Sequence, residues 1–228
     1  MKLLKTLSIA VIAFGCLAAS ASAADKNIDP GVVNRLPSKP ANEKVYIDLQ
    51  VAKKLDEINS KYKVGEAFSE EDAAYVKAHA LKVPERKAGA GFEAEAEASV
   101  QTDHYWYDGS RYVNGTGYYS QGYVTSDLGW IQHTVTTNLA GWVSDNKYVP
   151  KITNEVKYTA YGAVGTSGIG LIADLTLTND CLNANYCHQQ KAQGWSGVPV
   201  YYAIFPKSVF NTADVGAVDV LPTRTREW

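Results

Sequence analysis

Residues 155–178, EVKYTAYGAVGTSGIGLIADLTLT, contain two segments rich in apolar and β-branched residues with a short glycine-containing turn between them. The segments 155–164 and 168–178 flank Gly165-Thr166-Ser167, which is the spacing of a β-hairpin. In the second segment Leu171, Ala173, Leu175 and Leu177 occur at every second position, so a strand would place them on one face. The sequence therefore predicts a hairpin with one buried face at the centre of the fold.

Other segments with strand character surround this hairpin. Residues 131–137 alternate, with Ile131, His133, Val135 and Thr137 on one face and polar residues between them, and residues 198–205 form a further apolar strand. Turn-forming pairs recur at Asp108-Gly109, Asn114-Gly115, Asp145-Asn146 and Asn179-Asp180. Strands do not alternate with helices in this part of the sequence, so a parallel sheet is not expected. We therefore predict a mainly β fold, with an antiparallel β-sandwich or barrel-like domain over residues 100–228.

The part before this domain has a different chemistry. All five tryptophans and 12 of the 15 tyrosines follow residue 98. Residues 48–58 place apolar side chains at helical spacing, and Ser69 followed by three acidic residues is typical of a helix N-terminus. We predict a small helical segment over residues 24–86 and a linker over 87–99. The segment is either a pro-segment removed on maturation or a stable accessory unit.

The first 23 residues have the three-part order of a secretory signal peptide. Lys2 and Lys5 precede an uncharged apolar segment, residues 7–19, and Ala21-Ser22-Ala23 follows as a small-x-small cleavage site. The apolar segment is shorter than the roughly 20 residues of a membrane-spanning helix. We expect a secreted or periplasmic product of bacterial type that begins at Ala24, with lipid attachment at Cys16 as the alternative.

Charge and motifs exclude several classes of function. The formal net charge is −2, and no cluster of lysine or arginine is present, so nucleic-acid binding has no electrostatic support. The sequence contains no nucleotide-binding loop and no metal-site spacing, so no cofactor and no metal are expected. It does not indicate an oligomeric state.

Two cysteines, Cys181 and Cys187, remain after removal of the signal peptide. A close pair of cysteines in an exported chain predicts a disulfide bond. The five residues between them are polar and turn-prone, so we expect the bond to shape a surface loop.

The stretch from His104 to Tyr123 is the most unusual part of the chain, because it combines six tyrosines and one tryptophan with glycine-containing turns. Tyrosine and tryptophan have a flat apolar face and a polar tip, which suits contact with sugars and protein surfaces. We predict a ligand-binding face for a glycan or another cell-surface ligand. Its candidate residues are Trp106, Tyr107, Asp108, Arg111, Tyr112, Tyr118 and Tyr119. The alternative is that these aromatics are cross-strand pairs that stabilise a sheet.

Two other functions compete with this recognition protein. A secreted peptidase, made as a zymogen, would draw its catalytic groups from Glu155, His133 and His104, although no catalytic motif surrounds them. A membrane-damaging toxin would insert the hairpin of residues 160–177, whose only charged residue is Asp174. The same composition is typical of a buried core hairpin, so membrane contact has no further support in the sequence.

Overall fold

The computed structural model describes residues 44–45, 48–83, 100–165 and 168–226. All of them belong to one compact unit, Ser38–Trp228. The predicted signal peptide of residues 1–23, Cys16 and the predicted linker of residues 87–99 lie outside the described residues.

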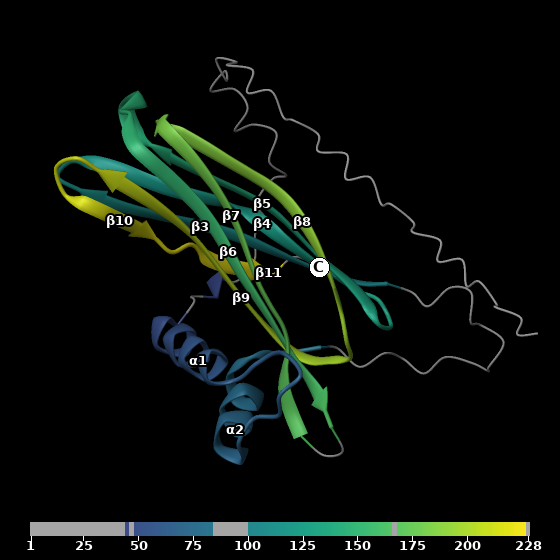
Figure 1. Ribbon diagram of the computed structural model, residues 1–228. Helices are drawn as coiled ribbons and strands as arrows, with labels where there is room; N and C mark the ends of the chain where they lie inside the picture. Colours follow the sequence, from purple (N-terminus) through teal and green to yellow (C-terminus); the bar gives the residue numbers. More distant parts are fainter. Residues whose placement is uncertain (1–43, 46–47, 84–99, 166–167, 227–228) are drawn as a thin grey trace, which may run out of the picture. The chain divides into compact units, whose positions relative to one another are not determined.

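Two antiparallel sheets pack face to face (Figure 1). Sheet A has the strand order β1 (Lys44–Val45), β11 (Thr223–Arg226), β3 (Gln101–Val113), β4 (Thr116–Leu128), β5 (Gln132–Val143) and β8 (Tyr186–Ser196). Sheet B has the order β10 (Gly216–Val220), β9 (Pro199–Thr212), β6 (Val149–Val164) and β7 (Gly168–Ala184), and β2 (Leu81–Lys82) pairs with β9. The predicted β-sandwich is confirmed, and the described strands do not close into a barrel.

The core between the sheets follows from residue alternation along the strands. On β5, His133, Val135 and Thr137 are buried, whereas Gln132 is exposed and Thr134 is half-buried, as the sequence pattern predicts. Ile131 was predicted on the buried face, but it precedes the strand and is 50% exposed. Val135 joins a cluster that includes Tyr105 and Tyr107 of β3 and residues of sheet B. The inner faces of both sheets therefore supply two apolar clusters, one around Val135 and another around Ile152 and Phe210.

The β6–β7 hairpin is confirmed, with β6 as a central strand of sheet B. A register shift between Ala160 and Tyr161 of β6 marks a β-bulge at Ile172 of β7. Ala173 and Leu177 pack between the sheets, but Leu171 packs with Tyr161 on the opposite face. The prediction that Leu171 shares a face with the other two was wrong, because the bulge interrupts the two-residue period of the strand.

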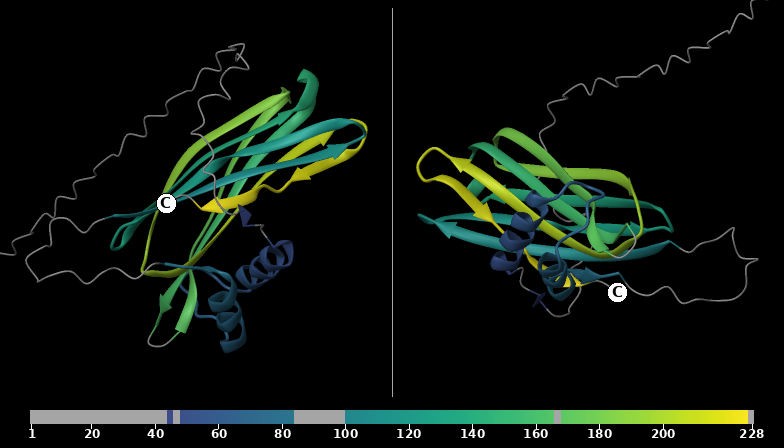
Figure 2. Two further views of the ribbon diagram at one scale, coloured as in Figure 1. Left: turned by 180° about the vertical axis from the view of Figure 1, so that it is seen from behind. Right: turned by 60° about the horizontal axis from the view of Figure 1, so that its bottom comes forward.

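The helical segment contains α1 (Leu49–Lys61) and α2 (Glu70–His79). Asp48 caps α1 by accepting the backbone N–H of Gln50, and Ser69 caps α2 by accepting that of Asp72. Figures 1 and 2 show both helices beside sheet B. The apolar contacts between helices and sheet involve Leu55, Ile58, Phe68, Val76, Tyr161, Leu171 and Ala203. The predicted helices are confirmed, and they are packed onto the sandwich.

Two of the four predicted turns are present. Asn114-Gly115 joins β3 to β4, and Asp145-Asn146 lies in a 3₁₀ turn, Ser144–Asn146; all four residues have positive φ. The other two predictions were wrong, because Asp108-Gly109 lies inside β3 and Asn179-Asp180 lies inside β7. A Cβ at Gly109 would lie 2.7 Å from the Cα of Pro222, so this glycine permits a close backbone approach instead of a turn.

The predicted disulfide is present between Cys181 and Cys187, with a Cα–Cα distance of 5.6 Å. Cys181 belongs to β7 and Cys187 to β8, so the bond joins an edge strand of sheet B to an edge strand of sheet A. The bond therefore constrains the contact between the two sheets as well as the connecting loop. Within the described ranges, no helix is long and apolar enough to cross a membrane.

Candidate functional site

The β3–β4 hairpin divides the aromatic stretch between the two faces of sheet A. Tyr105 and Tyr107 of β3 belong to the core between the sheets, and Tyr118 of β4 packs against Phe210 of sheet B with ring centroids 5.2 Å apart. Because neighbouring residues of a strand point to opposite faces, Trp106 and Tyr119 lie on the outer face. The candidate ligand-binding residues are therefore not all on one surface.

Three of the candidate residues are inaccessible. Trp106, Tyr107 and Tyr118 have exposed fractions of 1%, 0% and 3%. Trp106 stacks on Tyr123, the residue opposite it on β4, with ring centroids 6.4 Å apart. Burial raises the pKa of the Tyr107 hydroxyl far above its ordinary value. These three side chains pack in the fold and offer no surface to a ligand.

Three other aromatic residues form a row on the outer face of sheet A, near the Asn114-Gly115 turn. The ring of Trp142 on β5 is stacked on that of Tyr119, with centroids 5.3 Å apart and planes 9° apart. Tyr112 stands at 83° to Tyr119, and their hydroxyl oxygens are 2.6 Å apart. Tyr112 is 68% exposed, while Tyr119 and Trp142 are half-buried. We call Tyr112, Tyr119 and Trp142 the outer aromatic row.

The strand register extends this row to the sheet edge. Trp142 lies opposite Tyr119 on one side and opposite Tyr186 of β8 on the other, and Tyr186 is half-buried. Sequence reasoning did not identify Trp142 or Tyr186, since they lie 23 and 67 positions beyond Tyr119. Only the pairing of β4 with β5 and of β5 with β8 brings them together.

Polar side chains occupy the next row of the same face. Asp108, Gln121 and His188 are at successive cross-strand positions of β3, β4 and β8, with Ala140 of β5 between the last two. The imidazole Nε2 of His188 is 2.9 Å from the side-chain oxygen of Asn138. Burial lowers the pKa of His188, so its ring is neutral at neutral pH. This row supplies hydrogen-bonding groups beside the outer aromatic row.

The remaining candidate, Arg111, is exposed on β3 and its guanidinium donates a long hydrogen bond, 3.4 Å, to the carbonyl oxygen of Asp219. The hydroxyl of Tyr119 stays protonated well above neutral pH, because its hydrogen bond with Tyr112 raises its pKa. Arg111 shares the face of its cross-strand partner Tyr118, so it lies on the side of sheet A opposite the outer aromatic row.

The candidate catalytic residues lie in three separate parts of the fold. His104 is exposed on the outer face of sheet A, with its Nδ1 3.0 Å from the hydroxyl of Thr125. His133 is buried on the inner face, where its ring packs on Trp195 and its Nε2 is 2.9 Å from the carbonyl oxygen of Gly197. Glu155 forms an ion pair of 2.9 Å with Lys207 on sheet B. No catalytic group is assembled from these three residues.

The hairpin considered for membrane insertion lies in the core. Its β6 residues Ala160 and Tyr161 are fully buried, Ala160 between the two sheets and Tyr161 against the helices. Its only charge, Asp174, is exposed and accepts a hydrogen bond of 3.2 Å from Thr159. Its apolar composition is thus accounted for by packing within the sandwich.

Among the residues that the structure describes, no group of three or more histidine, cysteine, aspartate or glutamate side chains is arranged to hold a metal ion. The chain matches no family model, no curated protein and no solved structure.

Proposed function

We propose that the protein is an exported recognition protein that binds a glycan on the outer face of sheet A. The observation that carries this proposal is the outer aromatic row, which places two tyrosines and a tryptophan side by side on an accessible surface. Tyr112 is 68% exposed, and the apolar faces of aromatic rings complement the C–H faces of sugar rings.

The polar groups of this face support a sugar ligand more than an apolar one. Gln121, Asn138 and His188 carry neutral donors and acceptors, which suit the hydroxyl groups of a carbohydrate. The hydroxyls of Tyr112 and Tyr119 add two more polar tips at the rim. Asp108 adds a carboxylate to the same row, so this face favours a neutral glycan over an anionic one.

Export is the second part of the proposal. The signal-peptide pattern of residues 1–23 predicts it, and the disulfide between Cys181 and Cys187 is consistent with an oxidising compartment. A glycan on a cell surface or in the periplasm would be within reach of such a product.

A glycan array followed by calorimetric titration of the best binder tests the proposal. The variants are Tyr112→Ala and Trp142→Ala, and the matched control is Trp130→Ala, which removes a 68% exposed tryptophan from the β4–β5 connection at the other end of the sheet. We expect at least a tenfold loss of affinity in the first two variants and none in the control. Equal affinity in all three, or no binding to any glycan, would contradict the proposal.

A further inference from the structure

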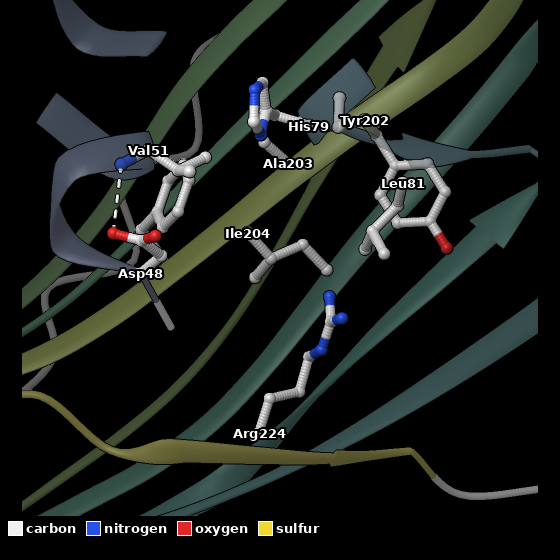
Figure 3. Close-up of a pocket in the computed structure, with 10 residues that line it drawn as sticks. Asp48, Val51, His79, Leu81, Tyr202, Ala203, Ile204 and Arg224 are labelled. Carbon is white, nitrogen blue, oxygen red and sulfur yellow. Dashed lines mark hydrogen bonds between the residues drawn. The ribbon is translucent and has the colours of Figure 1, made fainter. Parts of the chain in front are cut away.

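A second feature, separate from the outer aromatic row, is a pocket where the edge of the sandwich meets the helices (Figure 3). Its volume is about 210 Å³, below the range of about 300–1,000 Å³ that is typical of sites for drug-sized ligands. The walls include apolar side chains of α1, β2 and β9, among them Val51, Leu81 and Ile204. A pocket of this size and lining fits a small molecule with an apolar body.

The most notable polar group of the pocket is the guanidinium of Arg224. Figure 3 shows this side chain extending from β11 toward Ile204. Its Cζ lies 5.3 Å from the centroid of the Tyr105 ring, a cation–π contact that holds the side chain in place. Arg224 is half-buried, and within the described part of the chain no acidic residue forms an ion pair with it.

Two of the other three polar side chains of the pocket, Asp48 and Tyr202, are hydrogen-bonded within the protein, and the ring of the third, His79, packs on Tyr75 with centroids 4.2 Å apart. The carboxylate of Asp48 accepts the backbone N–H groups of Gln50 and Val51 at 2.8 and 3.4 Å. The hydroxyl of Tyr202 donates to Asp103 at 2.6 Å and is also hydrogen-bonded to the hydroxyl of Tyr105. Burial raises the pKa of Tyr202 far above its ordinary value, so the hydroxyl carries no negative charge that would compete for Arg224.

We propose that this pocket binds a small monocarboxylate, whose carboxylate pairs with Arg224 and whose apolar body lies against Leu81 and Ile204. A planar guanidinium presents two parallel N–H donors that match a carboxylate, and the pair is stronger in a partly desolvated site. A single cation favours a single negative charge over a phosphate dianion. A ligand of about eight non-hydrogen atoms in such a site has an affinity on the order of millimolar.

Hexanoate and benzoate are the probes, and hexanamide is the neutral isostere of hexanoate. Binding is measured by the thermal shift of the full mature chain and by calorimetric titration, at ligand concentrations up to about 20 mM. We expect both carboxylates to bind and hexanamide to bind at least tenfold more weakly. Equal binding of hexanoate and hexanamide, or no binding of either carboxylate, would overturn the proposal.

Variants locate the site. Arg224→Gln removes the cation and Leu81→Trp fills the pocket without changing its charge, and both are expected to reduce hexanoate binding at least tenfold. The matched control, Arg111→Gln, removes an exposed arginine outside the pocket and is expected to bind hexanoate as the unchanged chain does. Circular dichroism establishes that each variant is folded; unchanged binding in folded Arg224→Gln and folded Leu81→Trp would show that the carboxylate binds elsewhere.

Discussion

Replacement of Asn154 by alanine tests how the two sheets are held together. Asn154 lies on β6 of sheet B and has no exposed surface. Its amide nitrogen donates to the carbonyl oxygens of Leu139 and Cys187 on sheet A, at 3.1 and 2.9 Å. Its side-chain oxygen accepts the hydroxyl of Ser208 at 2.7 Å, and Ser208 lies 2.8 Å from the hydroxyl of Ser120. The amide is therefore a polar link across an apolar interface.

The expected cost follows from these three hydrogen bonds. Each contributes about 1 kcal/mol, and the partners left unsatisfied in the interior add to this, so Asn154→Ala should lower the free energy of unfolding by about 3–5 kcal/mol. For a chain of this size the melting temperature falls by about 2–4 °C per kcal/mol, which gives a decrease of roughly 10 °C. Thermal melting followed by circular dichroism measures this decrease.

Asn211→Ala is the matched control, because Asn211 is half-buried on the neighbouring strand β9. Surface substitutions of this kind change stability by about 0.5 kcal/mol or less. If Asn154→Ala melted within about 3 °C of Asn211→Ala, a small difference at this chain length, the cross-sheet link would contribute little and the reasoning would be refuted.

Three further predictions concern other parts of the fold. Replacing Cys181 and Cys187 together by alanine opens a very short closed loop, so the chain-entropy model predicts a loss of about 2 kcal/mol; melting curves that match those of the oxidised chain would contradict it. Gly122→Ala should destabilise the fold by about 3 kcal/mol or more, because the new Cβ would lie 2.0 Å from the carbonyl oxygen of Asn138. In the control Gly194→Ala the nearest atom to the new Cβ is 3.6 Å away, so this variant should melt almost unchanged. Similar urea midpoints for the two variants would disprove the clash. Burial acts to raise the pKa of Asp72, but hydrogen bonds from Tyr62 and Lys61 outweigh it and hold that pKa below the ordinary 3.8. The contribution of Asp72 to stability is therefore present above about pH 4 and is lost as the pH falls through its folded-state pKa. Urea titrations of Asp72→Asn and the unchanged chain should therefore differ at pH 7 and converge in acid, and a constant difference would count against this ion pair.

Local patterns in the sequence predicted much of the fold. The alternation of β5, the β6–β7 hairpin, the capped helices and the cysteine pair each depend on residues within one short segment. The errors came from distant contacts. Asp108-Gly109 has the composition of a turn, but Gly109 is required because Pro222, 113 positions later, passes close to it. The bulge at Ile172 likewise cannot be recognised from a regular apolar pattern.

The candidate site was predicted only in part, for the same reason. The composition of residues 104–123 indicated an aromatic surface, and Tyr112 and Tyr119 do lie on the outer face. Alternation along β3 places Tyr107 and Trp106 on opposite faces of the sheet, but no pattern in the neighbouring sequence predicts that Trp106 is buried as well. Trp142 lies beside Tyr119 only because β4 pairs with β5, which its sequence position does not reveal.

Backbone and indole NMR signals recorded during titration with the best-binding glycan test the central claim most directly. The indole N–H of Trp142 should shift with the ligand, together with the backbone amides of Tyr112 and Tyr119, while the indole N–H of the buried Trp195 stays unchanged. Shifts confined to other surfaces, with the signals of the outer aromatic row unmoved at saturation, would contradict the assignment of this face as the glycan-binding site.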